Sequence, residues 1–261
     1  MKRSTLLGWV IFAFGATYFI LPLLATFEFS LRMLRGQYSF EAYSVVFGDA
    51  QFRATFLYSA VLALVTIVLG ALVVVPTAYL VRLRLPHLRG LVEFVTLLPL
   101  VVPAIVIVFG YLRLYNSSSW LPLTGSDAAT NALLAFGYVT LALPYMYRTV
   151  DTGMRAIDVK TLTEAAESLG ASWSTIMLKV ILPNVRSAVL AGAFLTFAIV
   201  IGEFTFASLL NRPAFGPYLQ LMGANRAYEP SALAIIAFLV TWACMGLIQI
   251  FGRKRGAITV P

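Results

Sequence analysis

The chain has 261 residues, of which 60% are hydrophobic and only 11% are charged, and its mean hydropathy is +0.88. Soluble globular domains carry about 25% charged residues, so this composition excludes that class and predicts an integral membrane protein. The formal net charge of +8 does not call for nucleic acid, because topology and anionic lipid headgroups account for it. We therefore expect membrane lipids, and no nucleic acid, among the partners.

Six apolar segments follow one another along the chain, and each is long enough to cross a bilayer as a helix, which takes about 17–25 residues. We expect an all-α integral membrane protein with one transmembrane domain over residues 1–261. The expected spans are about 5–30, 54–82, 91–114, 128–149, 185–211 and 230–252.

The first apolar segment follows Lys2 and Arg3, as the core of a secretory signal peptide would. A signal-peptide core is only about 7–15 residues long, and this segment is longer and has bulky residues such as Phe27 and Phe29 near its end. We expect a retained span, with a cleaved signal peptide as the alternative.

Four prolines fall within the second, third and fourth expected spans: Pro76, Pro99, Pro103 and Pro144. Each should interrupt helical hydrogen bonding, and in lipid such breaks persist only where protein or a watery cavity satisfies the freed carbonyls. The prolines fit helices bundled around a passage, but they fit ordinary membrane helices equally well.

The basic residues are distributed unequally between the two sides that six spans create. One side carries 13 of the 19 Lys and Arg residues, and the other carries six. Because cytoplasmic loops carry the excess of Lys and Arg, we expect both termini to be cytoplasmic.

Residues typical of catalytic or metal sites are sparse. No P-loop, HExxH or GxSxG motif is present, Cys244 is the only cysteine, and His87 lies alone in a basic loop. We expect no catalytic residues, no metal site and no enzymatic activity in this chain.

The segment 158–183, between the fourth and fifth expected spans, is the most polar helical-looking stretch. Thr161 and Glu164 have the spacing of a capping box that begins a helix. Helical periodicity then predicts one apolar face made of Leu162, Ala165, Ala166 and Leu169. Gly170 can adopt the left-handed conformation that ends this helix.

A second amphipathic helix should follow the glycine. Ser172 or Ser174 can cap it, and Pro183 should lead into the fifth span. Its apolar face is predicted to contain Trp173, Ile176, Met177, Val180 and Ile181. Two helices joined by a glycine, with small residues such as Ala165 and Ala166 on the ridge, suit docking of another protein. A pair of helices resting on the membrane surface is the alternative.

Glu203 is an ionisable residue inside the fifth expected span. Such residues are costly to insert and usually face a partner or an aqueous path. Gly202 before it and Phe204 after it would suit a groove that receives a cation. Snorkelling of Glu203 to a nearby interface is the alternative.

Glu164-Ala165-Ala166, then Gly170 and finally Leu182-Pro183 resemble the EAA signature of permease subunits in type I, binding-protein-dependent ABC importers. Val180 stands where that family usually has isoleucine. The resemblance, carried by six specified positions at fixed spacing, extends to six spans with both ends cytoplasmic and so covers nearly the whole chain.

The resemblance implies that segment 158–183 is the coupling helix, which sits in a cleft of a separate ATPase. Glu164, Ala165, Ala166, Gly170, Leu182 and Pro183 would be the coupling residues. The implied partners are two ATP-binding cassette subunits, which hold ATP and Mg, a second and different permease, and an extracytoplasmic binding protein. The implied location is the bacterial inner membrane.

The passages from Ile157 to Pro183 and from Ala227 to Ile236 are similar to the second permease of spermidine/putrescine importers. This similarity implies a polyamine substrate, with Gly202, Glu203 and Phe204 on the substrate path, although Gly202 occupies a position where that group tends to be acidic. Ferric iron, phosphonate, thiamine and sulfate remain alternatives. A secondary transporter or a channel is the alternative class.

Overall fold

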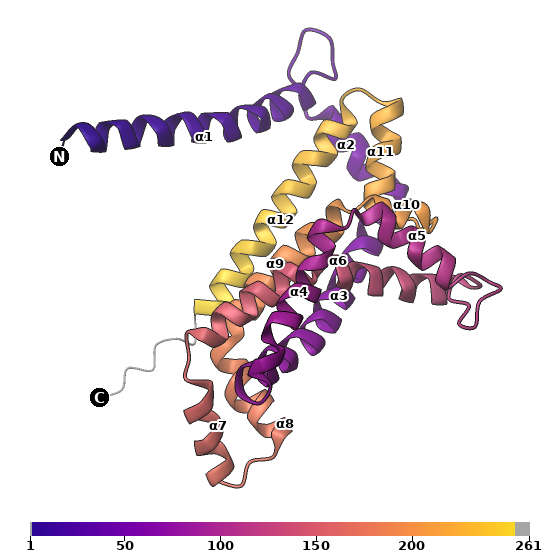
Figure 1. Ribbon diagram of the computed structural model, residues 1–261. Helices are drawn as coiled ribbons and strands as arrows, with labels where there is room; N and C mark the ends of the chain where they lie inside the picture. Colours follow the sequence, from indigo (N-terminus) through magenta and orange to yellow (C-terminus); the bar gives the residue numbers. More distant parts are fainter. Residues whose placement is uncertain (1, 254–261) are drawn as a thin grey trace. The chain divides into compact units, whose positions relative to one another are not determined.

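The computed structural model describes residues 2–253 (Figure 1), and every regular element in that range is helical, as the predicted fold class requires. The elements are α1 Lys2–Ser30, α2 Glu41–Gly48, α3 Ala50–Leu83, a 3-10 turn Pro86–Leu88, α4 Arg89–Val101, α5 Ala104–Leu114, α6 Asp127–Arg155, α7 Val159–Ser168, α8 Trp173–Thr175, a π-helical segment Ile176–Ile181, α9 Leu182–Gly202, α10 Thr205–Leu209, α11 Phe215–Asn225 and α12 Glu229–Arg253.

Four helices of the described chain are long and apolar enough to cross a membrane: Leu7–Ser30, Ala50–Leu83, Asp127–Arg155 and Trp173–Gly202. A fifth crossing results if α4 and α5 are taken together, and the apolar part of α12, Glu229–Cys244, is shorter. The expected six spans are therefore not confirmed. The fifth expected span, 185–211, also stops early, because α9 ends at Gly202.

The third expected span is broken in the middle. Its two halves, Pro86–Val101 and Ala104–Leu114, are bent by 102°. Pro103 explains the position of the break, because the residue before a proline is driven out of the helical region, and Val102 is extended with a ψ of 121°. The other three prolines lie inside continuous helices, so the expected interruption of the helix path occurs at Pro103 alone among the four.

The described residues form two compact units. One comprises residues 1–54 and 218–240. In it Tyr218 Oη donates a 2.6 Å hydrogen bond to Asp49 Oδ2, and the rings of Phe29 and Tyr228 lie 5.0 Å apart. These contacts join the residue between α2 and α3 to α11, and the end of α1 to the loop before α12.

The other unit comprises residues 55–217 and 241–253, and its main packing is between α6 and α9 (Figure 1). Gly192 of α9 makes their close approach possible, because a Cβ there would lie 2.6 Å from Sδ of Met146. At the end where α6 stops, Met146, Val150 and Met154 join a buried core that also takes in residues of α3, α7 and the π-helical segment. This core positions segment 158–183.

Candidate functional site

Helix α7 begins earlier in the segment than the capping-box pattern predicted. Asp158 is the N-cap: its Oδ1 accepts a hydrogen bond from Thr161 N at 3.1 Å, and its Oδ2 accepts one from Thr161 Oγ1 at 2.7 Å. Thr161 is therefore a residue of the first turn, and the prediction of Thr161 as the cap is wrong. The hydrogen bonds from Thr161 hold the pKa of Asp158 below its usual value.

The buried face of α7 is also rotated from the predicted one. Val159, Thr163 and Ala166 are buried, whereas Ala165 is exposed and Leu169 is 88% exposed. Thr163 tolerates burial because its Oγ1 donates to Val159 O at 2.7 Å. Of the four residues predicted to share one apolar face, Ala166 is buried, Leu162 is half-buried and the other two are exposed. The expected docking ridge is therefore exposed at Ala165, but Ala166 is not available for docking.

The turn after α7 adopts the geometry that its glycine allows. Gly170 has φ +75°, its N–H bonds to Glu167 O at 2.9 Å, and Ala171 N–H bonds to Ala166 O at 3.0 Å. These two bonds make a Schellman motif, in which the residue after the helix must be left-handed. The predicted conformation of Gly170 is confirmed, and a Cβ built there would meet no atom within 4 Å.

The second helix of the segment is continuous with the long helix α9. Ser172 caps it, as one of the two predicted serines, and the helix runs from Trp173 to Gly202 without a break at Pro183. The π-helical turns just before Pro183 explain why: the proline ring would clash with the carbonyl of Lys179 in a regular α-helix, and wider turns relieve that clash. Pro183 therefore does not separate the second helix from the span.

The core face of this second helix was predicted largely correctly. Ile176, Met177 and Ile181 are buried, and Val180 packs against the same core, but Trp173 is about half exposed. Trp173 and the neighbouring Leu169 therefore place apolar surface on the exposed side of the Gly170 turn.

The carboxylates of α7 lie on its exposed side. Glu164 is 3.8 Å from the ammonium of Lys160, and Glu167 is 3.6 Å from the guanidinium of Arg84. Both pairs are solvent-exposed and therefore weak. An exposed surface, which we call the turn surface, is thus formed by Glu164, Ala165, Glu167, Leu169 and Gly170.

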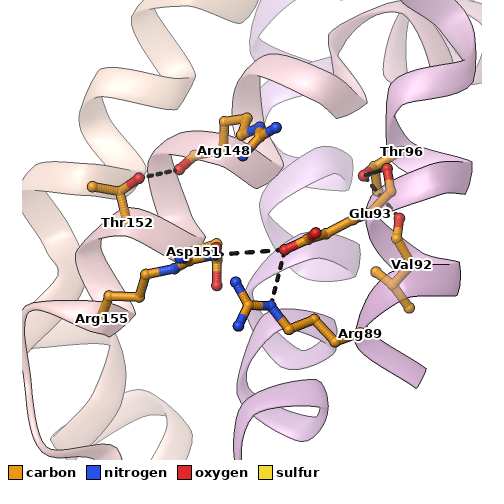
Figure 2. Close-up of polar contacts among 8 residues, drawn as sticks. All are labelled: Arg89, Val92, Glu93, Thr96, Arg148, Asp151, Thr152 and Arg155. Carbon is orange, nitrogen blue, oxygen red and sulfur yellow. Dashed lines mark hydrogen bonds and ion pairs between the residues drawn. The ribbon is translucent and has the colours of Figure 1, made fainter. Parts of the chain in front are cut away.

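An ion cluster lies where α6 leads into the segment (Figure 2). Glu93 of α4 accepts a 2.9 Å bond from Arg89 Nε, and its Oε1 is 3.5 Å from Arg155 Nη2. Arg155 also binds Asp151 through Nε at 2.9 Å and Nη2 at 2.5 Å. Sequence reasoning missed this cluster. The i,i+4 spacing within each helix was visible, but the contact between helices was not.

Glu203 lies outside segment 158–183, directly after the end of α9. It is 8% exposed, and its two carboxylate oxygens accept hydrogen bonds from Phe206 N at 2.8 Å and Ala207 N at 3.2 Å. It therefore caps the short helix α10. Gly202 and Phe204 beside it are exposed. A role for these three residues on a substrate path stays a prediction.

Gly216 supports the same region, and sequence reasoning missed it. A Cβ built on Gly216 would overlap the backbone carbonyl oxygen of Glu203. The chain between α9 and α10 can therefore pass this closely only where α11 has a glycine. Across residues 2–253, no group of three or more His, Cys, Asp or Glu side chains is placed to hold a metal ion.

Comparison with known proteins places this geometry in a family. The family model described as "binding-protein-dependent transport system inner membrane component" matches residues 75–254, which include the turn surface and the ion cluster. The chain is 28% identical to the probable ABC transporter permease protein y4fN of Sinorhizobium fredii, over 99% of this chain and 49% of that protein. It is 30% identical to the spermidine/putrescine transport system permease protein PotC of Escherichia coli, over 47% of each chain. These alignments span about half the length of the curated relatives.

Solved structures support the fold alone. A bacterial ABC transporter involved in the import of the acidic polysaccharide alginate superposes with a TM-score of 0.69 at 14% identity, covering 95% of this chain and 96% of that chain. An amino acid ABC transporter gives a TM-score of 0.56 at 20% identity, covering 81% of this chain and 97% of that chain.

Proposed function

Because the chain belongs to the ABC importer permease family of binding-protein-dependent transport system inner membrane components, we propose that it passes a small solute from an extracytoplasmic binding protein to the cytoplasm. The energy would come from ATP bound with Mg by two separate ATP-binding cassette subunits. A second permease, a different chain, would complete the passage.

The observation that carries this proposal is the turn surface. Its Schellman turn is fixed by internal hydrogen bonds, whereas the side chains of Glu164, Ala165 and Leu169 are exposed. A rigid turn with exposed apolar and acidic side chains suits insertion into a cleft of another protein. We propose that this cleft belongs to the ATP-binding subunit and that Glu164, Ala165 and Gly170 contact it.

The other three predicted coupling residues would act indirectly. Ala166 is buried beneath the turn, and Leu182 and Pro183 lie at the start of α9, next to the π-helical segment. These residues would hold the segment rigidly on α9, so that force on the turn reaches the long helix.

The orientation follows from the same assignment. The turn surface would be cytoplasmic, with both termini on that side of the bacterial inner membrane. The excess of Lys and Arg that the six expected spans place on this side supports the proposal.

Replacing Gly170 with leucine tests the function. Leucine at φ +75° strains the turn and places a side chain on the face that would enter the cleft. We expect uptake to fall about tenfold, as for loss of a central interface contact. Gly36→Leu is the matched control, because Gly36 has φ +78° and a Cβ there also meets no atom within 4 Å.

Two measurements decide the outcome: co-purification of the ATP-binding subunits, and solute uptake into vesicles. Loss of either in Gly170→Leu, with both retained in Gly36→Leu, supports the proposal. Normal uptake and normal co-purification in Gly170→Leu would refute it.

For the substrate we propose a polyamine of the spermidine/putrescine type. The similarity to PotC supports this proposal, although relatives also include a probable sulfate transport system permease of Zygnema circumcarinatum, 26% identical over 80% of this chain. Ferric iron, phosphonate, thiamine and sulfate remain the alternatives. Thermal-shift measurement of the partner binding protein with spermidine, putrescine and each alternative decides between them. Stabilisation by an alternative and not by either polyamine would overturn the proposal.

A further inference from the structure

Glu93 is a carboxylate shared between two arginines on different helices. Arg89 belongs to the same helix, α4, whereas Arg155 is the last residue of α6 (Figure 2). In the part of the chain that the structure describes, the 3.5 Å contact between Glu93 Oε1 and Arg155 Nη2 is an ion pair that joins α4 to α6. Glu93 is 31% and Arg155 42% exposed, so both side chains are partly shielded from solvent.

The position of Arg155 gives this pair mechanical importance. Three residues, Ala156 to Asp158, separate it from the first residue of α7. Asp151, which is buried, holds the guanidinium of Arg155 in place through two hydrogen bonds. A force on α7 therefore reaches Arg155 before it reaches the rest of α6.

Glu93 connects the ion pair to α5. It lies in α4, which continues to the 102° bend at Val102 and Pro103 and then into α5. In α5, Tyr111 packs edge-on against Phe206 of α10, with ring centroids 5.8 Å apart. A contiguous set of contacts therefore runs from α7, through the Glu93–Arg155 pair, to α10, whose first backbone N–H groups bind Glu203.

We propose that the Glu93–Arg155 ion pair positions α4 on α6, so that the bent pair α4–α5 follows the coupling segment when the ATP-binding subunits close. The inference rests on the proposed function. Both residues are positioning residues: they act through the helices that they join, and neither contacts the solute.

Spin-label distances in the complete transporter, reconstituted in lipid nanodiscs with its ATP-binding subunits, test this inference. In a Cys244→Ser background, labels replace Leu91 of α4 and Thr152 of α6, both exposed. In the otherwise native chain, the distance between these labels should be the same with and without ATP and Mg, because the two helices move together. In Glu93→Gln it should change on nucleotide binding by about 1–2 Å, the usual size of helix shifts at interfaces.

Two further variants separate positioning from simple loss of structure. Arg89→Gln removes the pair within α4 but keeps the link between helices, so its label distance should behave as in the native chain. Arg155→Lys keeps the charge and should restore most of the native behaviour, whereas Arg155→Gln should resemble Glu93→Gln. A distance in Glu93→Gln that does not respond to nucleotide would overturn the inference.

Co-purification of the ATP-binding subunits with the native chain keeps the two proposals distinguishable. If the subunits co-purify, the label pair at Leu91 and Thr152 tests the ion pair alone. If they do not co-purify with the native chain, the proposed function itself fails.

Discussion

The turn surface around Gly170 and the region around Glu203 both carry acidic residues near a helix end, yet they use them differently. Glu164 and Glu167 are exposed, and their ion pairs with Lys160 and Arg84 are long, at 3.8 Å and 3.6 Å. Both carboxylate oxygens of Glu203 are bound to backbone N–H groups inside the protein. A polar group with no internal use points to a partner, whereas one with all its oxygens bound is explained by the fold.

The largest expected loss of stability comes from adding a methyl group at Gly216, which packs against the backbone of Glu203. In Gly216→Ala the new methyl group overlaps the backbone carbonyl oxygen of Glu203, and backbone cannot move aside as a flexible side chain can. We expect a loss of about 3 kcal/mol or more in the free energy of unfolding, the upper range for overpacking. Thermal unfolding of the purified protein measures it.

Gly223→Ala is the control for this substitution. Gly223 lies in the same helix, α11, and a Cβ there meets no atom within 4 Å. It should be neutral or slightly stabilising, since alanine favours a helix by about 1 kcal/mol over glycine. Equal stability of the two variants would contradict the close packing at Gly216.

The next prediction compares two adjacent alanines of α7. Ala166→Leu should lower the free energy of unfolding by about 1–3 kcal/mol, because Ala166 is buried in the core beneath the turn. Ala165→Leu should leave stability nearly unchanged, because Ala165 is exposed, but should weaken co-purification of the ATP-binding subunits. The reverse pattern, with Ala165→Leu as the less stable protein, would show that the face is assigned incorrectly.

Glu203→Gln should have a smaller effect on stability. Glutamine keeps one oxygen to accept a backbone N–H of α10, but the other position becomes a donor, so one of two bonds is lost at a cost of about 1–2 kcal/mol. Thermal unfolding with Glu41→Gln, an exposed residue of α2, as the control measures this cost. Spermidine uptake by the same variants then tests the substrate path: a fall in uptake larger than the loss of folded protein is expected if Glu203 also meets a polycation.

Local features of the turn could be predicted from the sequence, because each depends on a few neighbouring residues. Gly170 after a helical stretch predicts a left-handed C′ position, and Ser172 before Trp173 predicts a cap. The N-cap was misplaced because Asp158 and Thr161 both suit the position, and only two residues lie between them. Local pattern does not choose between two such candidates.

Features that depend on other helices could not be predicted. The core face of α7 includes Thr163, whose hydroxyl is satisfied by its own helix, so a pattern of apolar residues does not reveal it. The role of Glu203 depends on where α9 stops, and the closeness of Gly216 to Glu203 depends on how α11 returns. The Glu93–Arg155 contact likewise requires the placement of α4 against α6.

The smallest expected effect concerns the start of the turn region, at Asp158. Because the hydrogen bonds from Thr161 lower the pKa of Asp158 in the folded state, its stabilisation of α7 is present above the unfolded pKa of about 3.9 and is lost as the pH falls through the folded value. Asp158→Ala should therefore speed hydrogen exchange at Thr161 N at neutral pH, and the difference from the native chain should vanish once the pH lies below the lowered folded-state pKa of Asp158. Glu167→Ala, which removes the same charge from the exposed side of α7, should leave that amide unchanged. Equal exchange at Thr161 in Asp158→Ala and the native chain at neutral pH would mean that α7 is held by its buried face alone, and the comparison would then rest on Gly170 and its exposed neighbours.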